Sequence, residues 1–143
     1  MICNLINYLK YDDMKKNEII SNYFSGFRLS SESKNKLKKI FPPKYSSFIG
    51  DHITFEYPSN IVPYTPKVVQ VVGYADDKSG LEALVVKIDG SIYRPDHKTY
   101  HITWSLDRKK GKKPVMSNYL ITKFGWKPTE LINIYVEPEL FKR

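Results

Sequence analysis

The sequence predicts an α+β domain, and two observations favour this fold class. The chain has 143 residues, which is the size of one ordinary domain and enough to close a hydrophobic core without disulfides or a structural metal. Its hydrophobic content of 41% is typical of globular proteins, and the apolar residues alternate between the periods of strands and of helices. We therefore expect a single domain over residues 1–143, in which residues 1–21 are an N-terminal extension with little pattern beyond a helix after Asp12 or Asp13.

The first predicted elements are a strand and a helix. Apolar residues predict the strand over residues 23–29. Ser30 or Ser31 can accept hydrogen bonds from the free amides of the helix that follows, and Pro42 and Pro43 end this helix. The helix is amphipathic, with Leu37, Ile40 and Phe41 on its inward side and Lys34, Lys36, Lys38 and Lys39 on its solvated side.

Further strands are predicted over residues 51–58, 67–74, 81–88, 99–107 and 131–136. Prolines mark the loop after the first of these strands, and residues 75–80 have the composition of a hairpin turn. The basic loop 108–113 follows the fourth strand. Ser117 can then cap a short helix that ends at Phe124.

Two of these strands carry the same tetrapeptide pattern, histidine-isoleucine-threonine-aromatic. The copies are His52-Ile53-Thr54-Phe55 and His101-Ile102-Thr103-Trp104. Successive side chains of a strand point to opposite faces, so each copy places its histidine and threonine on one face. We therefore expect the apolar face, formed by Ile53, Phe55, Tyr57, Ile102 and Trp104, to lie away from the histidines, with the isoleucines, Phe55 and Trp104 buried.

Two histidines with two hydroxyls suit the cleavage of a phosphodiester. Imidazole titrates near neutrality, so one ring can deprotonate the attacking water or hydroxyl while the other protonates the departing oxygen. The threonine hydroxyls can donate hydrogen bonds to the nonbridging phosphate oxygens. The predicted catalytic residues are therefore His52, Thr54, His101 and Thr103. The alternative is that they merely line a solvent-facing strand.

We expect neither a metal ion nor a cofactor. Cys3 is the only cysteine, so no thiolate cluster can hold zinc or an iron–sulfur centre, and no intramolecular disulfide can form. His97 and His101 are four residues apart, which on a strand is roughly 13 Å and too far for one tetrahedral ion. We place His97 in a surface loop.

The paired His-x-Thr motifs resemble those of the 2H phosphoesterase superfamily, which includes LigT-like RNA phosphodiesterases and the cyclic phosphodiesterase domain of fungal tRNA ligases. The resemblance runs from about Tyr23 onward and extends to residues 41–45, 93–96 and 113–118 around the motifs. It implies a bilobed fold with two antiparallel sheets around a central cleft and flanking helices. It also implies that His52 and His101 are the acid–base pair, and that Thr54 and Thr103 clamp the phosphate. The motifs are closer together than in many LigT-like proteins, which leaves little room for a lid.

Six further residues are candidates for substrate binding: Tyr64, Ser105, Lys112, Lys113, Ser117 and Asn118. Ser105 continues the polar face of the second motif, and the two lysines follow its strand and can reach a bound phosphate. Ser117 and Asn118 lie at a predicted helix N-terminus, a natural anion site, and Tyr64 can stack on a base. Each residue also has a plain structural interpretation as part of a solvated charge run, a helix cap or ordinary loop packing.

The net charge of +8 lies in the two flanks of the chain, since residues 51–93 carry 3 basic and 6 acidic groups. A basic surface attracts polyanions, which favours nucleotide or RNA substrates, although a merely lysine-rich soluble surface is an equal alternative. The N-terminus has a short apolar stretch without a basic leader, and nothing later approaches the ~20 apolar residues of a membrane span. We therefore expect a cytoplasmic, monomeric protein with no membrane association and no obligate protein partner.

These features predict a metal-independent phosphodiesterase that hydrolyses nucleotide phosphodiesters. One class of substrate is RNA with a 2′,3′-cyclic phosphate or a 2′–5′ linkage, as in RNA repair and processing. The alternative class is cyclic di- or oligonucleotide immune messengers, such as cGAMP, which some viral 2H proteins degrade to evade immunity. A rival from a different class is a noncatalytic nucleic-acid-binding module, which the basic flanks and the 11 tyrosines would also suit.

Overall fold

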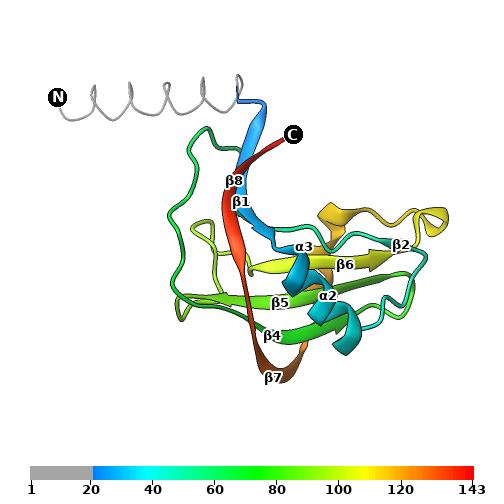
Figure 1. Cartoon of the computed structure of the whole chain (residues 1–143). Helices are drawn as coiled ribbons and strands as arrows, with labels where there is room; N and C mark the ends of the chain where they lie inside the picture. Colours follow the sequence, from blue (N-terminus) through cyan, green and yellow to red (C-terminus); the bar gives the residue numbers. More distant parts are fainter. Residues whose placement is uncertain (1–20) are drawn as a thin grey trace, which may run out of the picture.

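The computed structural model describes residues 21–143 and contains two antiparallel sheets with few helices (Figure 1). The predicted α+β class is confirmed at this level. The helix expected after Asp12 or Asp13 lies outside the described residues, as does Cys3. No helix within residues 21–143 is long and apolar enough to cross a membrane.

Each sheet contains one copy of the histidine motif. The smaller sheet has the order β3(His52–Glu56), β1(Tyr23–Leu29), β8(Val136–Lys142). The larger sheet has the order β2(Ser47–Phe48), β6(His101–Leu106), β5(Leu81–Ile88), β4(Val69–Asp76), β7(Lys127–Ile134). The first motif therefore lies on an edge strand, whereas the second lies between two neighbours.

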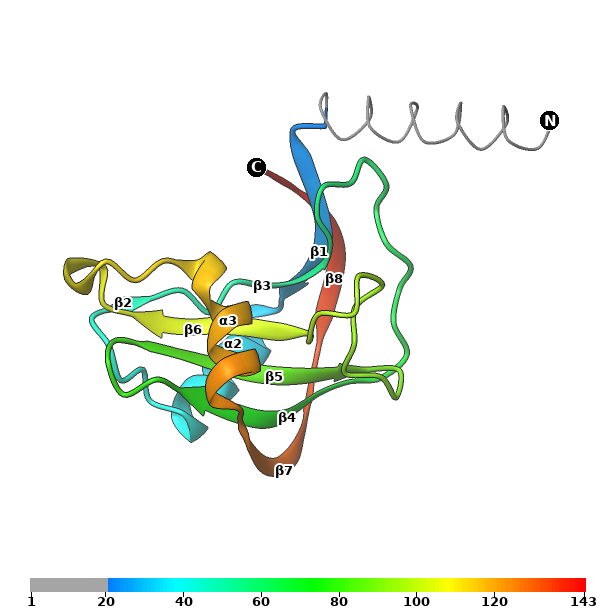
Figure 2. The ribbon, with the colours of Figure 1, turned by 180° about the vertical axis from the view of Figure 1, so that it is seen from behind.

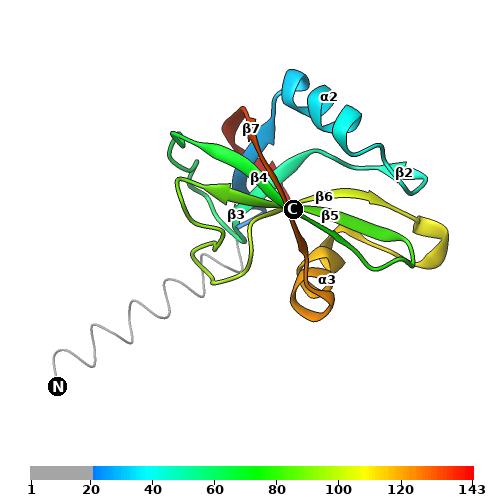
Figure 3. The ribbon, with the colours of Figure 1, turned by 90° about the horizontal axis from the view of Figure 1, so that it is seen from below.

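One helix covers each face of the larger sheet, as Figure 3 shows from below. These helices are α2(Ser31–Ile40) and α3(Ser117–Phe124). Leu37 of α2 packs in the core cluster that includes Trp104, and Leu120 of α3 packs in a second cluster with Val85. Since strand side chains alternate, these two clusters lie on opposite faces of the sheet.

The apolar faces of the two motifs meet in the main core, which joins the sheets. Ile53, Ile102 and Trp104 are fully buried, as predicted, whereas Phe55 is half-buried. The indole Nε1 of Trp104 donates a hydrogen bond to the carbonyl oxygen of Phe41 at 2.8 Å, so the polar atom of this buried ring is satisfied. The predicted assignment of faces is confirmed for the two tetrapeptides but not for Tyr57, which lies beyond the end of β3.

Helix α2 begins as predicted, and two of its three expected inward residues, Leu37 and Phe41, pack in the core. Ser30 is the N-cap, and its side chain accepts a hydrogen bond from the amide of Ser33 at 3.1 Å. Ile40, expected on the inward side, is 47% exposed because the chain turns away directly after it. Phe41 points inward as predicted, with its ring stacked on that of Tyr74 at 5.8 Å.

The predicted bounds of β1, β5 and α3 match the structure, and those of β3, β4 and β6 differ by one or two residues at their ends. The predicted strand 131–136 is wrong as a final element, because it spans the junction of β7 and β8. β2 and the 3₁₀ helices η1(Arg108–Lys110) and η2(Pro114–Met116) had no prediction. β8 contains Pro138, which an edge strand tolerates because its free side needs no donor.

The chain passes from the larger to the smaller sheet without a loop, because only Tyr135 separates β7 from β8 (Figure 2). The carbonyl oxygen of Tyr135 accepts a hydrogen bond from the amide of Ser30 at 3.0 Å. The amide of Tyr135 donates to the hydroxyl of Ser33 at 2.7 Å. Both backbone groups at the crossing are therefore held by the first turn of α2.

Candidate active site

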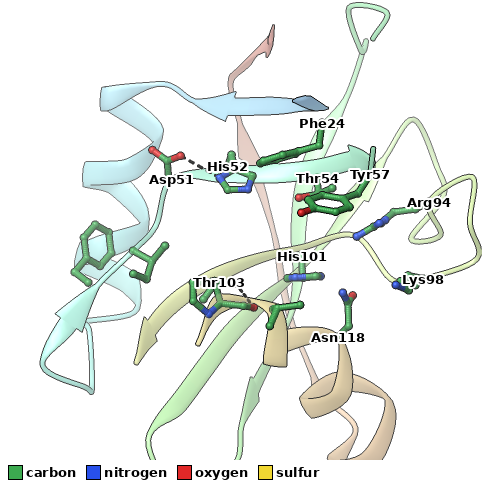
Figure 4. A pocket seen from close by; sticks show the side chains of 14 residues that line it. Phe24, Asp51, His52, Thr54, Tyr57, Arg94, Lys98, His101, Thr103 and Asn118 are labelled. Atoms are coloured by element: carbon green, nitrogen blue, oxygen red, sulfur yellow. Dashed lines mark hydrogen bonds and ion pairs between the residues drawn. The ribbon is translucent and has the colours of Figure 1, made fainter. Parts of the chain in front are cut away.

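The polar faces of β3 and β6 line one cavity of about 640 Å³, which residues of both sheets enclose (Figure 4). Its lining includes all four predicted catalytic residues, His52, Thr54, His101 and Thr103. Small-molecule sites in proteins typically measure ~300–1,000 Å³, so the cavity has the size of a ligand pocket. The structure thus brings the two copies of the motif together, while their catalytic roles stay a prediction.

His52 is oriented by a carboxylate and enclosed by aromatic rings. Its Nδ1 lies 3.0 Å from Oδ2 of Asp51, and because an ionised carboxylate only accepts, Nδ1 carries the proton (Figure 4). Nε2 has no hydrogen-bond partner among residues 21–143. The rings of Phe24 and Phe141 lie 5.3 and 4.7 Å from the imidazole. Burial lowers the pKa of His52 below its usual range, although the Asp51 carboxylate acts in the opposite direction.

A glycine makes room for part of this aromatic enclosure. A Cβ at Gly26 of β1 would lie 2.3 Å from the carbonyl oxygen of Ile53 and 3.2 Å from the ring of Phe141. Any larger residue would therefore push β3 or Phe141 out of place. The position of His52 thus depends on close packing of three strands.

Asp51 in turn belongs to a chain of charges that leads away from the cavity. Arg28 contacts Oδ1 of Asp51 at 2.8 Å and Oε2 of Glu139 at 2.6 Å. Its guanidinium also lies over the ring of Phe141, 4.8 Å from the centroid. The carboxylate that holds His52 is therefore itself held on its second oxygen.

His101 is oriented by the backbone rather than by a side chain. Its Nδ1 lies 2.9 Å from the carbonyl oxygen of Thr99, which can only accept, so Nδ1 carries the proton and Nε2 has a free lone pair. The pKa of His101 is lowered to about 4, mainly by burial and in smaller part by the positive charges of Arg94 and His52. His101 is therefore neutral at pH 7.

The two threonines differ in how far their hydroxyls are already used. The hydroxyl of Thr54 has no hydrogen-bond partner among residues 21–143. Oγ1 of Thr103 lies 2.8 Å from the hydroxyl of Ser117 and 3.3 Å from the carbonyl oxygen of Pro114. Thr54 can therefore donate directly to a ligand, whereas Thr103 has to redirect its one proton.

Of the six weaker candidates, only Asn118 lines the cavity. Its Oδ1 is buried and has no partner within the described part of the chain. Ser117 is not a side-chain cap, because α3 begins at Ser117 itself and its buried hydroxyl bonds to Thr103. It supports the site from behind instead of facing a ligand.

The other four candidates lie away from the cavity, for long-range reasons. A bulge leaves Trp104 without a partner on β5, and the alternation of side chains along β6 reverses after it. Ser105 therefore points away from the cavity, and its hydroxyl donates a hydrogen bond to the buried side chain of Glu82. Lys112 pairs with Asp77 in the β4–β5 turn at 2.8 Å, and Lys113 is exposed before η2. Tyr64 packs edge-on against Phe55, on the opposite side of β3 from the histidine.

Several residues line the cavity that were not predicted to do so. Tyr57 was assigned to the apolar face but lines the cavity, because β3 ends at Glu56 and the alternation ends with it. Its ring lies 5.3 Å from that of Phe24, so together they form an aromatic wall. Arg94 and Lys98 line the cavity on the side of His101 away from Thr103, although loop cations are usually solvated and give no sequence signal for this role.

His97 lies in an exposed turn, as predicted, with a φ of 69°. Within residues 21–143, no group of three or more histidine, cysteine, aspartate or glutamate side chains is arranged to hold a metal ion.

Comparison of the chain with known protein families, with curated proteins and with solved structures found no match.

Proposed function

We propose that this protein is a metal-independent phosphodiesterase that hydrolyses nucleotide phosphodiesters by two-histidine acid–base catalysis. The observation that carries the proposal is that His52 and His101, from different sheets, line one cavity, each with its Nδ1 proton engaged and its Nε2 free. Proton transfer by one positioned side chain typically contributes ~10²–10⁴ in rate. Two imidazoles can therefore supply both transfers that the reaction needs.

The environments of the two rings favour His101 as the base and His52 as the acid. His101 has a pKa of about 4, so its Nε2 is free to take a proton from the attacking water as the water oxygen bonds to phosphorus. Burial also lowers the pKa of His52, but the Asp51 carboxylate opposes that lowering by stabilising the imidazolium form. In this form His52 donates its Nε2 proton to the departing ribose oxygen as the phosphorus–oxygen bond breaks. Exchange with solvent then returns both rings to their starting states.

The remaining lining groups suit the other parts of a nucleotide. The free hydroxyl of Thr54 and the redirected hydroxyl of Thr103 can donate to the nonbridging phosphate oxygens. Buried Oδ1 of Asn118 can accept from a ribose hydroxyl or a base amine. Phe24 and Tyr57 offer rings on which a base can stack, a contact typically worth ~1–3 kcal/mol.

Two antiparallel sheets with one His-x-Thr copy in each also support the proposal that the fold is a bilobed 2H phosphoesterase-like fold. The substrate on this proposal is RNA with a 2′,3′-cyclic phosphate or a 2′–5′ linkage, with cyclic di- or oligonucleotide immune messengers as the alternative. We expect the enzyme to act as a cytoplasmic monomer.

The experiment is to incubate wild-type protein with 2′,3′-cyclic nucleotides, 2′–5′ oligonucleotides and cyclic dinucleotides in the presence of EDTA. We expect turnover that survives the chelator and disappears in His52→Ala and in His101→Ala. The matched control is His97→Asn, which removes the third histidine, outside the cavity, and keeps a residue that tolerates positive φ.

Two outcomes would contradict the proposal in different ways. Loss of activity in EDTA that added metal restores would rule out the metal-free mechanism. Nucleotide binding without turnover, with affinity unchanged in both histidine variants, would instead favour the noncatalytic nucleic-acid-binding module.

A further inference from the structure

A tight turn places two cations at one end of the cavity. The amide of Arg94 donates to the carbonyl oxygen of Lys98 at 2.7 Å, and a bridge between Tyr93 and Thr99 closes the turn below them. The side chains of Arg94 and Lys98 both line the cavity, beyond His101 as seen from Thr103 (Figure 4). The backbone therefore holds the pair in register beside the histidines.

Arg94 is buried with most of its donors unused. Its side chain is 4% exposed, and its guanidinium has a single hydrogen bond to residues 21–143, from Nη2 to Oδ2 of Asp96 at 2.7 Å. Its Nε is buried without a partner in the same part of the chain. A guanidinium has five N–H donors, and a buried charge is costly unless it is paired and hydrogen-bonded. An anion in the cavity would supply the missing acceptors.

Within residues 21–143, no carboxylate of the cavity lining pairs with these cations, and Asp96, the acidic partner of Arg94, is not part of that lining. Asp51 is the only lining carboxylate in this part of the chain, and its oxygens already contact Arg28 and His52. Lys98 is exposed and has no ion pair among the described residues. This part of the cavity is therefore positively charged, and Figure 4 shows Arg94 and Lys98 on the side of His101 away from Thr103.

We propose that Arg94 and Lys98 form a second anion subsite, which receives a phosphate group other than the one that is cleaved. A guanidinium matches phosphate oxygens in a bidentate geometry, and an ammonium adds a mobile point charge. The inference rests on the proposed function and narrows its substrate class. The substrate is a nucleotide with two phosphate groups, such as an oligonucleotide end or a cyclic dinucleotide, rather than a cyclic mononucleotide.

The first test measures binding alone, by calorimetry at fixed ionic strength. Adenosine 3′,5′-bisphosphate and adenosine 3′-monophosphate are titrated into wild type, Arg94→Gln, Lys98→Ala and the control Lys127→Ala. Lys127 is an exposed lysine on β7, away from the cavity lining. We expect wild type and the control to bind the bisphosphate about tenfold more tightly or better, because charge-assisted hydrogen bonds are the strong ones.

In Arg94→Gln and Lys98→Ala the affinity ratio of the two ligands should fall toward one. Since Arg94 is buried and its replacement can unfold the protein, Lys98→Ala on the surface keeps the test decisive. Equal affinity of wild type for both ligands would overturn the proposal. A ratio that is unchanged in Lys98→Ala and in folded Arg94→Gln would overturn it as well.

The second test compares kcat/KM for 2′,3′-cyclic AMP, for a dinucleotide that ends in a 2′,3′-cyclic phosphate, and for a cyclic dinucleotide with a 2′–5′ linkage. Wild type should prefer a substrate with two phosphates. Comparison of the linear and the cyclic dinucleotide then shows whether the second phosphate belongs to an oligonucleotide end or to a cyclic dinucleotide. Lys98→Ala should lower that preference. If wild type turns over none of them, the proposed function fails and the binding ratio still decides the subsite. If it turns over all with equal kcat/KM, the subsite is overturned and the proposed function stands.

Discussion

The two copies of the histidine motif share a sequence and a strand geometry but not an environment. In β3, a side-chain carboxylate holds Nδ1 of His52, and the hydroxyl of Thr54 has no partner among the described residues. In β6, a backbone carbonyl holds Nδ1 of His101, and the hydroxyl of Thr103 is already bonded to Ser117. The histidine and threonine of each copy thus acquire different chemistry from their neighbours, and each difference can be tested by substitution.

The largest effect should come from removing the imidazoles. We expect His101→Ala and His52→Ala each to lower kcat by ~10²–10⁴, because each removes one proton transfer. Single-turnover rates on the substrate found active in the panel measure this loss. Unchanged circular dichroism spectra are the control for folding. If either variant kept wild-type kcat, the corresponding copy would have no role in the chemistry.

The aromatic residues at the fourth position should differ in their contribution to stability. Trp104 is fully buried and donates a hydrogen bond to Phe41, whereas Phe55 is half-buried. We expect Trp104→Ala to lower the free energy of unfolding by ~3–5 kcal/mol and Phe55→Ala to lower it by less. Urea denaturation of both variants measures the difference. Equal losses would mean that burial is not what separates the two copies.

Acid should destabilise the fold through His101. Its pKa is lowered from 6.5 to about 4 in the folded protein, so the unfolded chain binds the extra proton between these values. The contribution of His101 to the free energy of unfolding is therefore fully present above about pH 6.5. It falls as the pH drops toward 4, by up to about 3 kcal/mol.

Urea denaturation at pH 7.5 and pH 4.5 tests this expectation, with His101→Gln as the comparison. The variant should lose less stability on acidification than wild type does. A pH dependence identical in the two proteins would place the acid-sensitive group elsewhere.

The smallest effect concerns the carboxylate that distinguishes the first copy. Asp51 raises the pKa of His52 against the lowering by burial, so Asp51→Asn should lower that pKa further. The fraction of protonated acid at pH 7 then falls, and we expect a loss of kcat/KM of up to about tenfold. The alkaline limb of the pH profile of kcat/KM should move to lower pH. A profile that does not move would show that His52 is not the acid.

The sequence predicted the parts of the site that follow from local alternation. Period-two spacing correctly placed His52, Thr54, His101 and Thr103 on cavity-facing sides of two strands. The failures come from interactions between distant residues. Ser105 points away from the cavity because of a bulge in the pairing of β6 with β5. Lys112 forms an ion pair with Asp77, 35 positions earlier in the chain. No local pattern carries either contact.

The same reason explains the fold elements that were missed. β8 contains two glutamates and Pro138, which do not read as a strand until β1 pairs with it. By its local sequence Arg94 looks like a solvated loop cation, but a tight turn buries it in the cavity lining. In both cases tertiary pairing overrides local preference.

The crossing at Tyr135 has a mechanical consequence for the opposing imidazoles. They belong to different sheets, and the shortest of the connections between those sheets is the single residue Tyr135, whose amide and carbonyl are both hydrogen-bonded to the first turn of α2. The separation of the two imidazoles is therefore set when the chain folds and not by the arriving ligand. We expect such a protein to select its ligands by width and to exclude those that would require the two sheets to move apart.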